Sequence, residues 1–269
     1  MKVSIISSVL NEERNIEEFV ESIKNQTLKP SEFIIVDGGS KDKTYFILKK
    51  LSKKIKFLKI FQKKGANIST SRNLAIKHSK SEIIVSIDAG TKYEGNWLKN
   101  LTEGFNGQVS FGIEKPIIKN KFQKILAKSI LHKGVPGSSR NMIFLKRIWK
   151  EVGGYPEDLN IAEDTLFDEK IKKVGYKISK VKNAICYWEM RENLEEVKKQ
   201  FYNYGYWDGV LQKKYGMLPK KYKILVFLLL VGYIFYPLFW VVSKFSLRVE
   251  IDLHRRYNYL NGFLKSYLE

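Results

Sequence analysis

The stretch that decides the fold is SEIIVSIDAGT (81–91), in which an apolar run ends at a single carboxylate, Asp88. A short apolar run bounded by turn residues is typical of a buried strand. Three similar runs precede it, at 2–10, 32–39 and 55–61, and helical apolar spacing separates the runs, at 16–23, 44–51 and 69–79. This alternation predicts βαβ units, and therefore an α/β fold with a mixed, mostly parallel sheet flanked by helices.

The pattern continues after Asp88, with strand-like stretches at 108–114, 139–145 and 177–188 and helical stretches at 96–105, about 120–131 and 163–174. The first residues, MKVSIISSV, have no small-residue cleavage pattern, so we interpret them as a strand and not as a signal peptide. We expect one α/β domain over residues 1–190.

The composition is that of a folded and strongly basic protein. Apolar residues make up 44% of the chain, and 48 Lys and Arg against 28 Asp and Glu give a net charge of +20. This charge favours nucleic acid, anionic lipid headgroups or phosphorylated substrates as partners. The single cysteine, Cys186, excludes an internal disulfide, and the three scattered histidines argue against a zinc site. A reducing, cytoplasmic setting is expected for the domain.

Residues 224–243, ILVFLLLVGYIFYPLFWVVS, carry no charge and are flanked by basic residues. A helix of this length matches the roughly 30 Å hydrocarbon core of a bilayer, which predicts a membrane helix, spanning or re-entrant. The alternative is a buried core helix, because Gly232 and Pro237 favour a kink. The remaining chain then divides into a basic, aromatic helical connector (191–222), a hydrophobic membrane helix (223–244) and a basic C-terminal tail (245–269).

Polar signatures end three of the first four predicted strands: NEE (11–13), DGGSKD (37–42) and DAGT (88–91). In open α/β sheets, ligands bind beyond the carboxyl ends of the strands, which favours a shared ligand site. The alternative is ordinary turn chemistry, because Asp, Gly and Ser are also common turn residues. Neither G-x-G-x-x-G nor G-x-x-x-x-G-K-[ST] occurs, so a nucleotide would be bound differently here.

Three side chains near these strand ends have suitable binding chemistry. Asp37 can accept hydrogen bonds from a ribose or a base. Arg72, in a helix that follows Gly65, can bind diphosphate oxygens bidentately, or it can pair with a nearby acid. Asp88 can give one oxygen ligand to Mg²⁺ or Mn²⁺, with substrate phosphates and water completing the coordination.

Glu163 and Asp164 open the helix predicted at 163–174. They can serve a site, or they can only complement the positive end of the helix dipole. Because adjacent helical positions point about 100° apart, one of the two carboxylates at most should face a cleft squarely.

In this order the motifs resemble those of the family 2 inverting glycosyltransferases of the GT-A fold. The stretch 4–16 is similar to the family's first strand and Asn-Glu turn, 34–44 to its nucleotide loop, and 65–76 to its Arg-Asn helix. The stretch 84–91 stands at the family's D-x-D metal motif, and 152–178 matches its Gly-Gly-aromatic turn and Glu-Asp acceptor motif. The resemblance covers residues 2–185. Gly38 and Gly90 stand where many members carry a second acid.

The resemblance implies a role for each matching residue. Asp164 would be the catalytic base, Glu163 would lie on the acceptor side, and Mg²⁺ or Mn²⁺ would bind at Asp88. The nucleotide-sugar contacts would come from Leu10, Glu12, Asp37, Arg72 and Asp88.

The implied activity is transfer of a sugar, with inversion, from a nucleoside-diphosphate sugar to a lipid-linked or glycan acceptor. The enzyme would act in cell-envelope polysaccharide synthesis at the cell membrane, with its catalytic domain on the cytoplasmic face. A non-catalytic nucleotide-sugar or lipid-binding module on the same fold is the alternative. A membrane-tethered nucleic-acid binder is disfavoured, because basic charge beside an apolar segment suits an anionic membrane.

Overall fold

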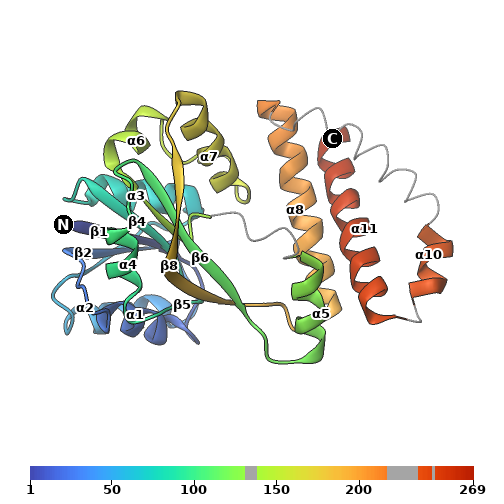
Figure 1. Ribbon diagram of the computed structural model, residues 1–269, viewed down its shortest axis with the longest axis horizontal. Coiled ribbons are helices and arrows are strands. Elements are labelled where there is room, and N and C mark those ends of the chain that lie inside the picture. Colours follow the sequence, from blue (N-terminus) through green and yellow to red (C-terminus); the bar gives the residue numbers. More distant parts are fainter. Residues whose placement is uncertain (131–137, 217–235, 244–245) are drawn as a thin grey trace. The chain divides into compact units, whose positions relative to one another are not determined.

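The computed structural model describes residues 1–130, 138–216, 236–243 and 246–269 (Figure 1). The chain divides into two units. The sheet unit comprises Met1–Pro116 and Val135–Glu189, and the helical unit comprises Ile117–Gly134 and Met190–Glu269.

The strands and helices follow the predicted alternation closely. The strands are β1 (Val3–Val9), β2 (Glu32–Asp37), β3 (Leu58–Gln62), β4 (Ile83–Asp88), β5 (Thr91–Tyr93), β6 (Val109–Ile117), β7 (Asn141–Leu145) and β8 (Ile178–Glu189). The helices around them are α1 (Ile16–Lys24), α2 (Thr44–Ser52), α3 (Ile68–His78), α4 (Trp97–Glu103), α6 (Lys146–Glu151) and α7 (Glu163–Val174). Only the short β5 and α6 were not expected from the sequence.

Within the described residues the strands form one eight-stranded sheet in the order β3-β2-β1-β4-β7-β6-β8-β5. The pairs β1–β2, β1–β4 and β2–β3 are parallel, whereas β4–β7, β6–β7 and β5–β8 are antiparallel. The predicted mixed sheet with flanking helices is confirmed. Its antiparallel part is larger than predicted, because apolar runs reveal where strands lie but not in which direction they pair.

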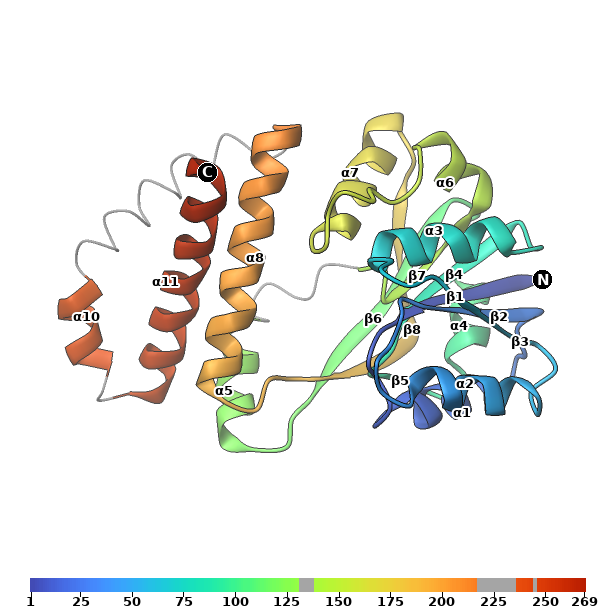
Figure 2. The same cartoon turned by 180° about the vertical axis from the view of Figure 1, so that it is seen from behind.

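Successive strand residues point to opposite faces of the sheet, and helices cover both faces. On β1, Ile5 packs in a cluster with residues of α1, α2 and α4, while Ile6 packs in a cluster with residues of α3, α6 and α7. Figure 2 shows α3 on one side of the sheet and α1 and α2 on the other. Burial on both faces explains why the central strands are apolar runs without alternation.

The connections create a switch point beside β1. The chain runs outward from β1 to β2 and β3, and then returns through α3 to β4 on the other side of β1. At the carboxyl end of β1, Val9 is in register with Asp37 and Ser8 is in register with Asp88. Loops diverge at such a point and leave room for a ligand. The sheet therefore brings two of the predicted site residues to one edge.

The helical unit contains α5 (Lys121–Ile130), α8 (Leu194–Tyr215), α10 (Tyr236–Ser243) and α11 (Leu247–Leu268). Helices α8 and α11 approach so closely that a Cβ on Gly205 would lie 1.8 Å from the carbonyl oxygen of Tyr259. A Cβ on Gly262 would lie 2.0 Å from the carbonyl oxygen of Tyr202. Small residues allow helix backbones this close to each other.

The apolar segment 224–243 lies largely outside the described residues, and its last part forms α10. In the part of the chain that the structure describes, no helix is long and apolar enough to cross a membrane. The stretch 245–269, which the sequence analysis treated as a basic tail, contains α11. Its buried residues, among them Ile251 and Phe263, are separated by charged positions that mask the helical spacing.

Replacing Gly205 with alanine should destabilise the helical unit. The added methyl group would meet a backbone carbonyl that belongs to the facing helix, so α8 and α11 would have to move apart. Overpacking of this kind costs about 1–3 kcal/mol, more than the roughly 1 kcal/mol gained when alanine replaces a helical glycine. We expect Gly205→Ala to lower the free energy of unfolding in urea denaturation.

The matched control is Lys199→Ala, at an exposed position of α8. This variant should stay within about 0.5 kcal/mol of the wild type. If Gly205→Ala were as stable as this control, the close approach of the two helices would be wrong.

Candidate active site

The loops that follow β1 and β2 are joined by hydrogen bonds. The Asn11 N–H donates to Ser40 Oγ at 2.9 Å, and the Lys41 N–H donates to Asn11 Oδ1 at 2.9 Å. The Glu12 N–H donates to Thr44 Oγ1 at 2.7 Å. Asn11 adopts a left-handed φ of 55°, which asparagine tolerates better than most residues. The predicted NEE and DGGSKD signatures therefore form one bonded surface.

Leu10 and Glu12, two predicted nucleotide contacts, lie on this surface. The Leu10 residue is 53% exposed, and Glu12 is half-buried. Burial raises the pKa of Glu12, and the charges of Asp42 and Asp88 raise it further. The charge of Asp88, at the end of β4, therefore acts on Glu12, and contact of Glu12 with a nucleotide stays a prediction.

The carboxylate of Asp37 is completely buried and accepts hydrogen bonds from its own surroundings. The N–H groups of Gly39 and Ser40 and the side-chain amide of Gln62 each donate to Oδ1 at 3.0 Å. The Ser40 hydroxyl donates to Oδ2. These bonds hold the loop after β2 in shape, and direct contact between Asp37 and a nucleotide stays a prediction.

The structure explains why position 38 carries glycine. A Cβ on Gly38 would lie 2.7 Å from the carbonyl oxygen of Ala66, closer than real contacts allow. The Gly65 N–H also donates to the Gly38 carbonyl at 2.9 Å, so the loop after β3 crosses directly over this residue. The chain's own backbone therefore occupies the space beside Gly38.

Arg72, on α3, is an almost completely buried cation. Its side chain is 1% exposed, and it donates from Nη1 to Glu163 at 2.7 Å and from Nη2 to Asp88 at 2.6 Å. The guanidinium also lies 5.3 Å from the ring centre of Tyr155. Burial alone lowers the pKa of Arg72, but Asp88 and then Glu163 more than offset this, so the pKa is raised. Arg72 thus pairs with two acids, and its contact with a diphosphate stays a prediction.

The next residue, Asn73, connects α3 through hydrogen bonds to α6 and to the turn that follows it. Its Nδ2 donates to the Tyr155 carbonyl and to Glu157, each at 2.9 Å. Its Oδ1 accepts from the Trp149 side chain and the Tyr155 N–H, again at 2.9 Å. The sequence analysis assigned Asn73 no role of its own. Its hydrogen bonds fix the helix that carries Arg72.

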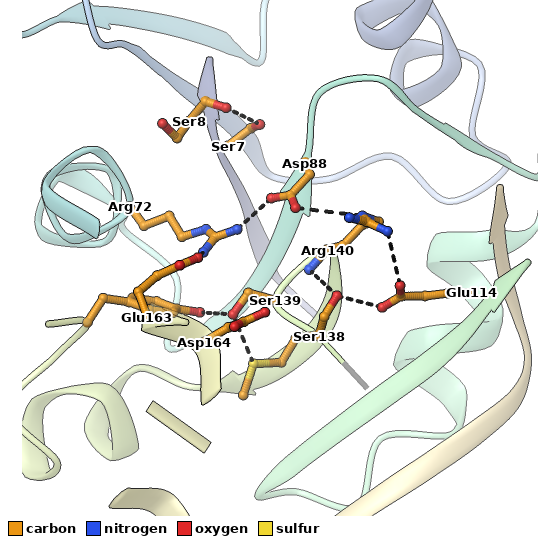
Figure 3. A network of polar contacts seen from close by, with 12 residues as sticks. Ser7, Ser8, Arg72, Asp88, Glu114, Ser138, Ser139, Arg140, Glu163 and Asp164 are labelled. Carbon is orange, nitrogen blue, oxygen red and sulfur yellow. Dashed lines mark hydrogen bonds and ion pairs between the residues drawn. The ribbon is translucent and has the colours of Figure 1, made fainter. Parts of the chain in front are cut away.

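Asp88 lies between two guanidinium groups (Figure 3). Oδ1 pairs with Arg72, and Oδ2 lies 3.7 Å from Nε of Arg140. Arg140 Nη1 in turn lies 3.3 Å from the buried carboxylate of Glu114. Burial raises the pKa of Glu114, and Arg140 opposes this shift. Arg140 and Glu114 were not expected from the sequence, because no local pattern shows that β7 pairs with β4.

Glu163 and Asp164 begin α7 immediately after Ala162, whose φ of 67° is left-handed. Glu163 is buried against Arg72, and burial raises its pKa to about 7 although Arg72 opposes the shift. Asp164 is half-buried, and the one hydrogen bond of its carboxylate among the described residues comes from the Thr165 N–H at 2.8 Å. The two acids therefore have different surroundings, and their roles in a reaction stay predictions.

The residues around Asp88 do not fit a resident metal ion. Both oxygens of Asp88 face guanidinium groups, and within the described ranges no three His, Cys, Asp or Glu side chains are grouped for a metal. Mg²⁺ ordinarily takes six ligands, mostly oxygens. At Gly90 nothing lies within 4 Å of an added Cβ, but the left-handed φ of 74° is one that residues with a side chain rarely adopt. Metal binding at Asp88 stays a prediction for the donor complex.

Comparison with known proteins identifies the family. The model of glycosyl transferase family 2 matches residues 4–147, more than half of the chain. The cholesterol galactosyltransferase of Borreliella burgdorferi is 32% identical over 100 residues, which cover 37% of this chain and 28% of that protein. The O-antigen chain rhamnosyltransferase of Salmonella typhimurium is 24% identical over 214 residues, which cover 69% of this chain and 65% of the relative. The chain thus spans less than two thirds of both.

A solved structure shows the same fold. The mannosyltransferase of Pyrobaculum calidifontis in complex with GDP-Man and Mn²⁺ superimposes with a TM-score of 0.63 at 18% sequence identity, covering 98% of this chain and 74% of that one. With the matched family model and the switch-point sheet, this shows that the chain belongs to glycosyl transferase family 2 and has its GT-A fold.

Proposed function

We propose that this protein is an inverting glycosyltransferase that moves a sugar from a nucleoside-diphosphate sugar to a lipid-linked or glycan acceptor. The observation that carries the proposal is Arg72, held at the switch point between Asp88 and Glu163 with Asp164 next in the chain. The named relatives support the acceptor class, because one is named for cholesterol and the other for the O-antigen chain.

The donor would lie across the carboxyl ends of β1, β2 and β4. Leu10, Glu12 and the loop shaped by Asp37 would contact the nucleoside, and Arg72 would contact the diphosphate. Both Nη atoms of Arg72 already face acids, so an entering diphosphate competes with Glu163 for the guanidinium. The binding energy of the donor therefore depends on the charge of Glu163.

The reaction would be a single displacement at the anomeric carbon. The acceptor oxygen forms the new bond, the bond to the diphosphate breaks, and its electron pair leaves with the nucleoside diphosphate. Asp164 would take the acceptor's proton as the bond forms, which is general-base catalysis. Among the residues that the structure describes, its carboxylate accepts one hydrogen bond, from the Thr165 N–H, and so retains acceptor capacity for a hydroxyl.

A divalent cation enters this proposal only as an ion that arrives with the donor. The mannosyltransferase of Pyrobaculum calidifontis is complexed with Mn²⁺. In this chain, Mg²⁺ or Mn²⁺ would have one protein carboxylate, Asp88, and would depend on the donor's phosphates and water for its other ligands.

The second candidate is a non-catalytic nucleotide-sugar or lipid-binding module on the same fold. Gly90 favours it, because the site has one carboxylate where the family pattern has two. Asp164, with spare acceptor capacity, favours the enzyme. Release of a nucleoside diphosphate from a sugar nucleotide upon addition of acceptor separates the two, because a binding module releases none.

We further propose that the enzyme works at the membrane, with the sheet unit on the cytoplasmic face. The uncharged stretch 224–243, its basic flanks and the net charge of +20 support this. Apolar contact and attraction to anionic headgroups would add together.

The full chain should therefore float with vesicles that contain anionic phosphatidylglycerol, and Leu229→Asp should weaken the association by placing a charge inside the apolar stretch. Flotation in a density gradient measures this. Wild-type protein that stays at the bottom of the gradient with every vesicle would refute membrane association.

Replacing Asp164 with asparagine should slow transfer strongly while preserving donor binding. The amide keeps the shape of the carboxylate but cannot take the acceptor's proton. We expect turnover to fall by a factor of about 10² to 10⁴. A thermal-shift screen with sugar nucleotides identifies the donor, and nucleoside-diphosphate release measures turnover.

The matched control is Glu169→Gln, the same acid-to-amide change at a half-exposed position of α7 where the carboxylate pairs with Lys172. This control should keep wild-type turnover. Near-normal turnover in Asp164→Asn would remove Asp164 from the role of base.

Donor affinity should rise as the pH falls through 7. The pKa of Glu163 is raised to about 7 by burial, so the carboxyl is neutral below that value and ionised above it. Ionised Glu163 competes with the diphosphate for Arg72, whereas neutral Glu163 does not. Calorimetric titration with a sugar nucleotide between about pH 6 and pH 8.5 should show tighter binding at the acid end, by at most about tenfold per pH unit for one proton.

In Glu163→Gln the side chain is neutral at every pH, so this dependence should flatten. An equal pH dependence in the wild type and in this variant would show that Glu163 does not compete with the donor.

A further inference from the structure

We propose that Arg140 is a second phosphate-binding side chain of the donor site. It supplies positive charge that would otherwise come from a metal ion held by a second carboxylate. This inference rests on the proposed function, because it assigns a further contact to the same donor diphosphate. It makes binding of the nucleoside diphosphate largely independent of a divalent cation.

The position of Arg140 follows from the direction of β7. This strand is antiparallel to β4, and Asn141 at its start is in register with Ile87 near the end of β4. The residue before β7 is therefore brought to the carboxyl end of β4, where Asp88 lies. Figure 3 shows Arg72 and Arg140 on two sides of Asp88.

The two guanidinium groups differ in how firmly they are held. Arg72 is 1% exposed, with partners at 2.6 and 2.7 Å. Arg140 is 30% exposed, and its contacts to Asp88 and Glu114 are longer, at 3.7 and 3.3 Å. Charge-assisted hydrogen bonds are usually about 2.7–2.9 Å long. Arg140 can therefore bind an entering oxyanion without breaking a short ion pair.

Other contacts keep Arg140 at this position. Its guanidinium lies 5.4 Å from the ring centre of Trp188, and its backbone carbonyl accepts a hydrogen bond from the Tyr93 hydroxyl at 2.8 Å. Five N–H groups are available on a guanidinium, and the ion pairs found in the described part of the chain use only Nε and Nη1. The Nη2 edge is therefore available to a phosphate oxygen.

The charge around Asp88 is the second argument. With glycine at position 90, Asp88 is the single acid of the family's metal motif, and two guanidinium groups neutralise it from both sides. Each guanidinium also pairs with a second acid, Glu163 or Glu114. Burial raises the pKa of both acids, which lowers the negative charge that they set against a diphosphate at the two arginines. Arginine suits diphosphate binding because its planar fork matches phosphate oxygens and it is always charged.

If Arg140 had a purely structural role, the effect of removing it would depend on the charge of Glu114. In that case Arg140 would serve only to compensate a buried carboxylate, and its removal would harm the protein by leaving Glu114 unpaired. Replacing Glu114 with glutamine at the same time removes the unpaired charge. The double variant therefore separates compensation of Glu114 from contact with the donor.

The test is calorimetric titration of the full chain with UDP, GDP, ADP and dTDP, in Mn²⁺ and in EDTA. The Kd of wild-type protein for its preferred nucleotide should differ by no more than about threefold between Mn²⁺ and EDTA. Loss of a hydrogen bond to a charged group costs about 1.5–3 kcal/mol, so Arg140→Ala should weaken binding in EDTA by roughly tenfold or more. Part of this loss should return with Mn²⁺.

Three further variants sharpen the test. Arg140→Ala/Glu114→Gln should bind as weakly as Arg140→Ala, and Arg140→Lys should be intermediate, because it keeps the charge but lacks the fork. The matched control is Lys92→Ala, which removes an exposed cation that pairs with Glu18, and it should bind as the wild type does.

Two sets of outcomes are distinguishable. Unchanged binding by Arg140→Ala, wild-type binding by the double variant, or wild-type binding that requires Mn²⁺ overturns the role of Arg140 and leaves the proposed function standing. A wild-type protein that binds none of the four nucleotides in either condition overturns the proposed function as well.

Discussion

The active site depends on the burial of one charge, the guanidinium of Arg72. A buried charge is tolerated only when it is paired and hydrogen-bonded. Asp88 from β4 and Glu163 from α7 provide this pairing. One guanidinium thereby joins α3 and the neighbouring β4 to α7, whose Glu163 lies 91 positions further along the chain. Because Asp164 directly follows Glu163, the position of the proposed base is also set by this pairing.

Two glycines mark where this chain departs from the family's pattern, for different physical reasons. Gly38 is imposed by packing, since the backbone at Ala66 occupies the space of its side chain. Gly90 has open space beside it, but its left-handed φ of 74° favours glycine over an acid. In our proposal, Arg140 supplies the positive charge that a metal ion held by this acid would contribute.

The helical unit is stabilised in a different way from the sheet unit. Parallel and antiparallel strands bury apolar side chains on both faces of the sheet, whereas α8 and α11 rely on glycines that bring their backbones together. Charged positions along α11 mask its apolar spacing, which is why the sequence suggested a tail. Close backbone packing leaves no strong hydrophobic pattern by which such a helix could be recognised.

The sequence by itself determined the order of strands and helices, the strand-end signatures and the family, because apolar periodicity and turn chemistry are local properties. It also located Arg72, Asp88, Glu163 and Asp164. Only the tertiary structure decided the antiparallel pairing of β7 with β4, and hence the place of Arg140 and Glu114 beside Asp88. Strand direction and the partners of a buried charge depend on contacts between distant segments, which no local pattern encodes.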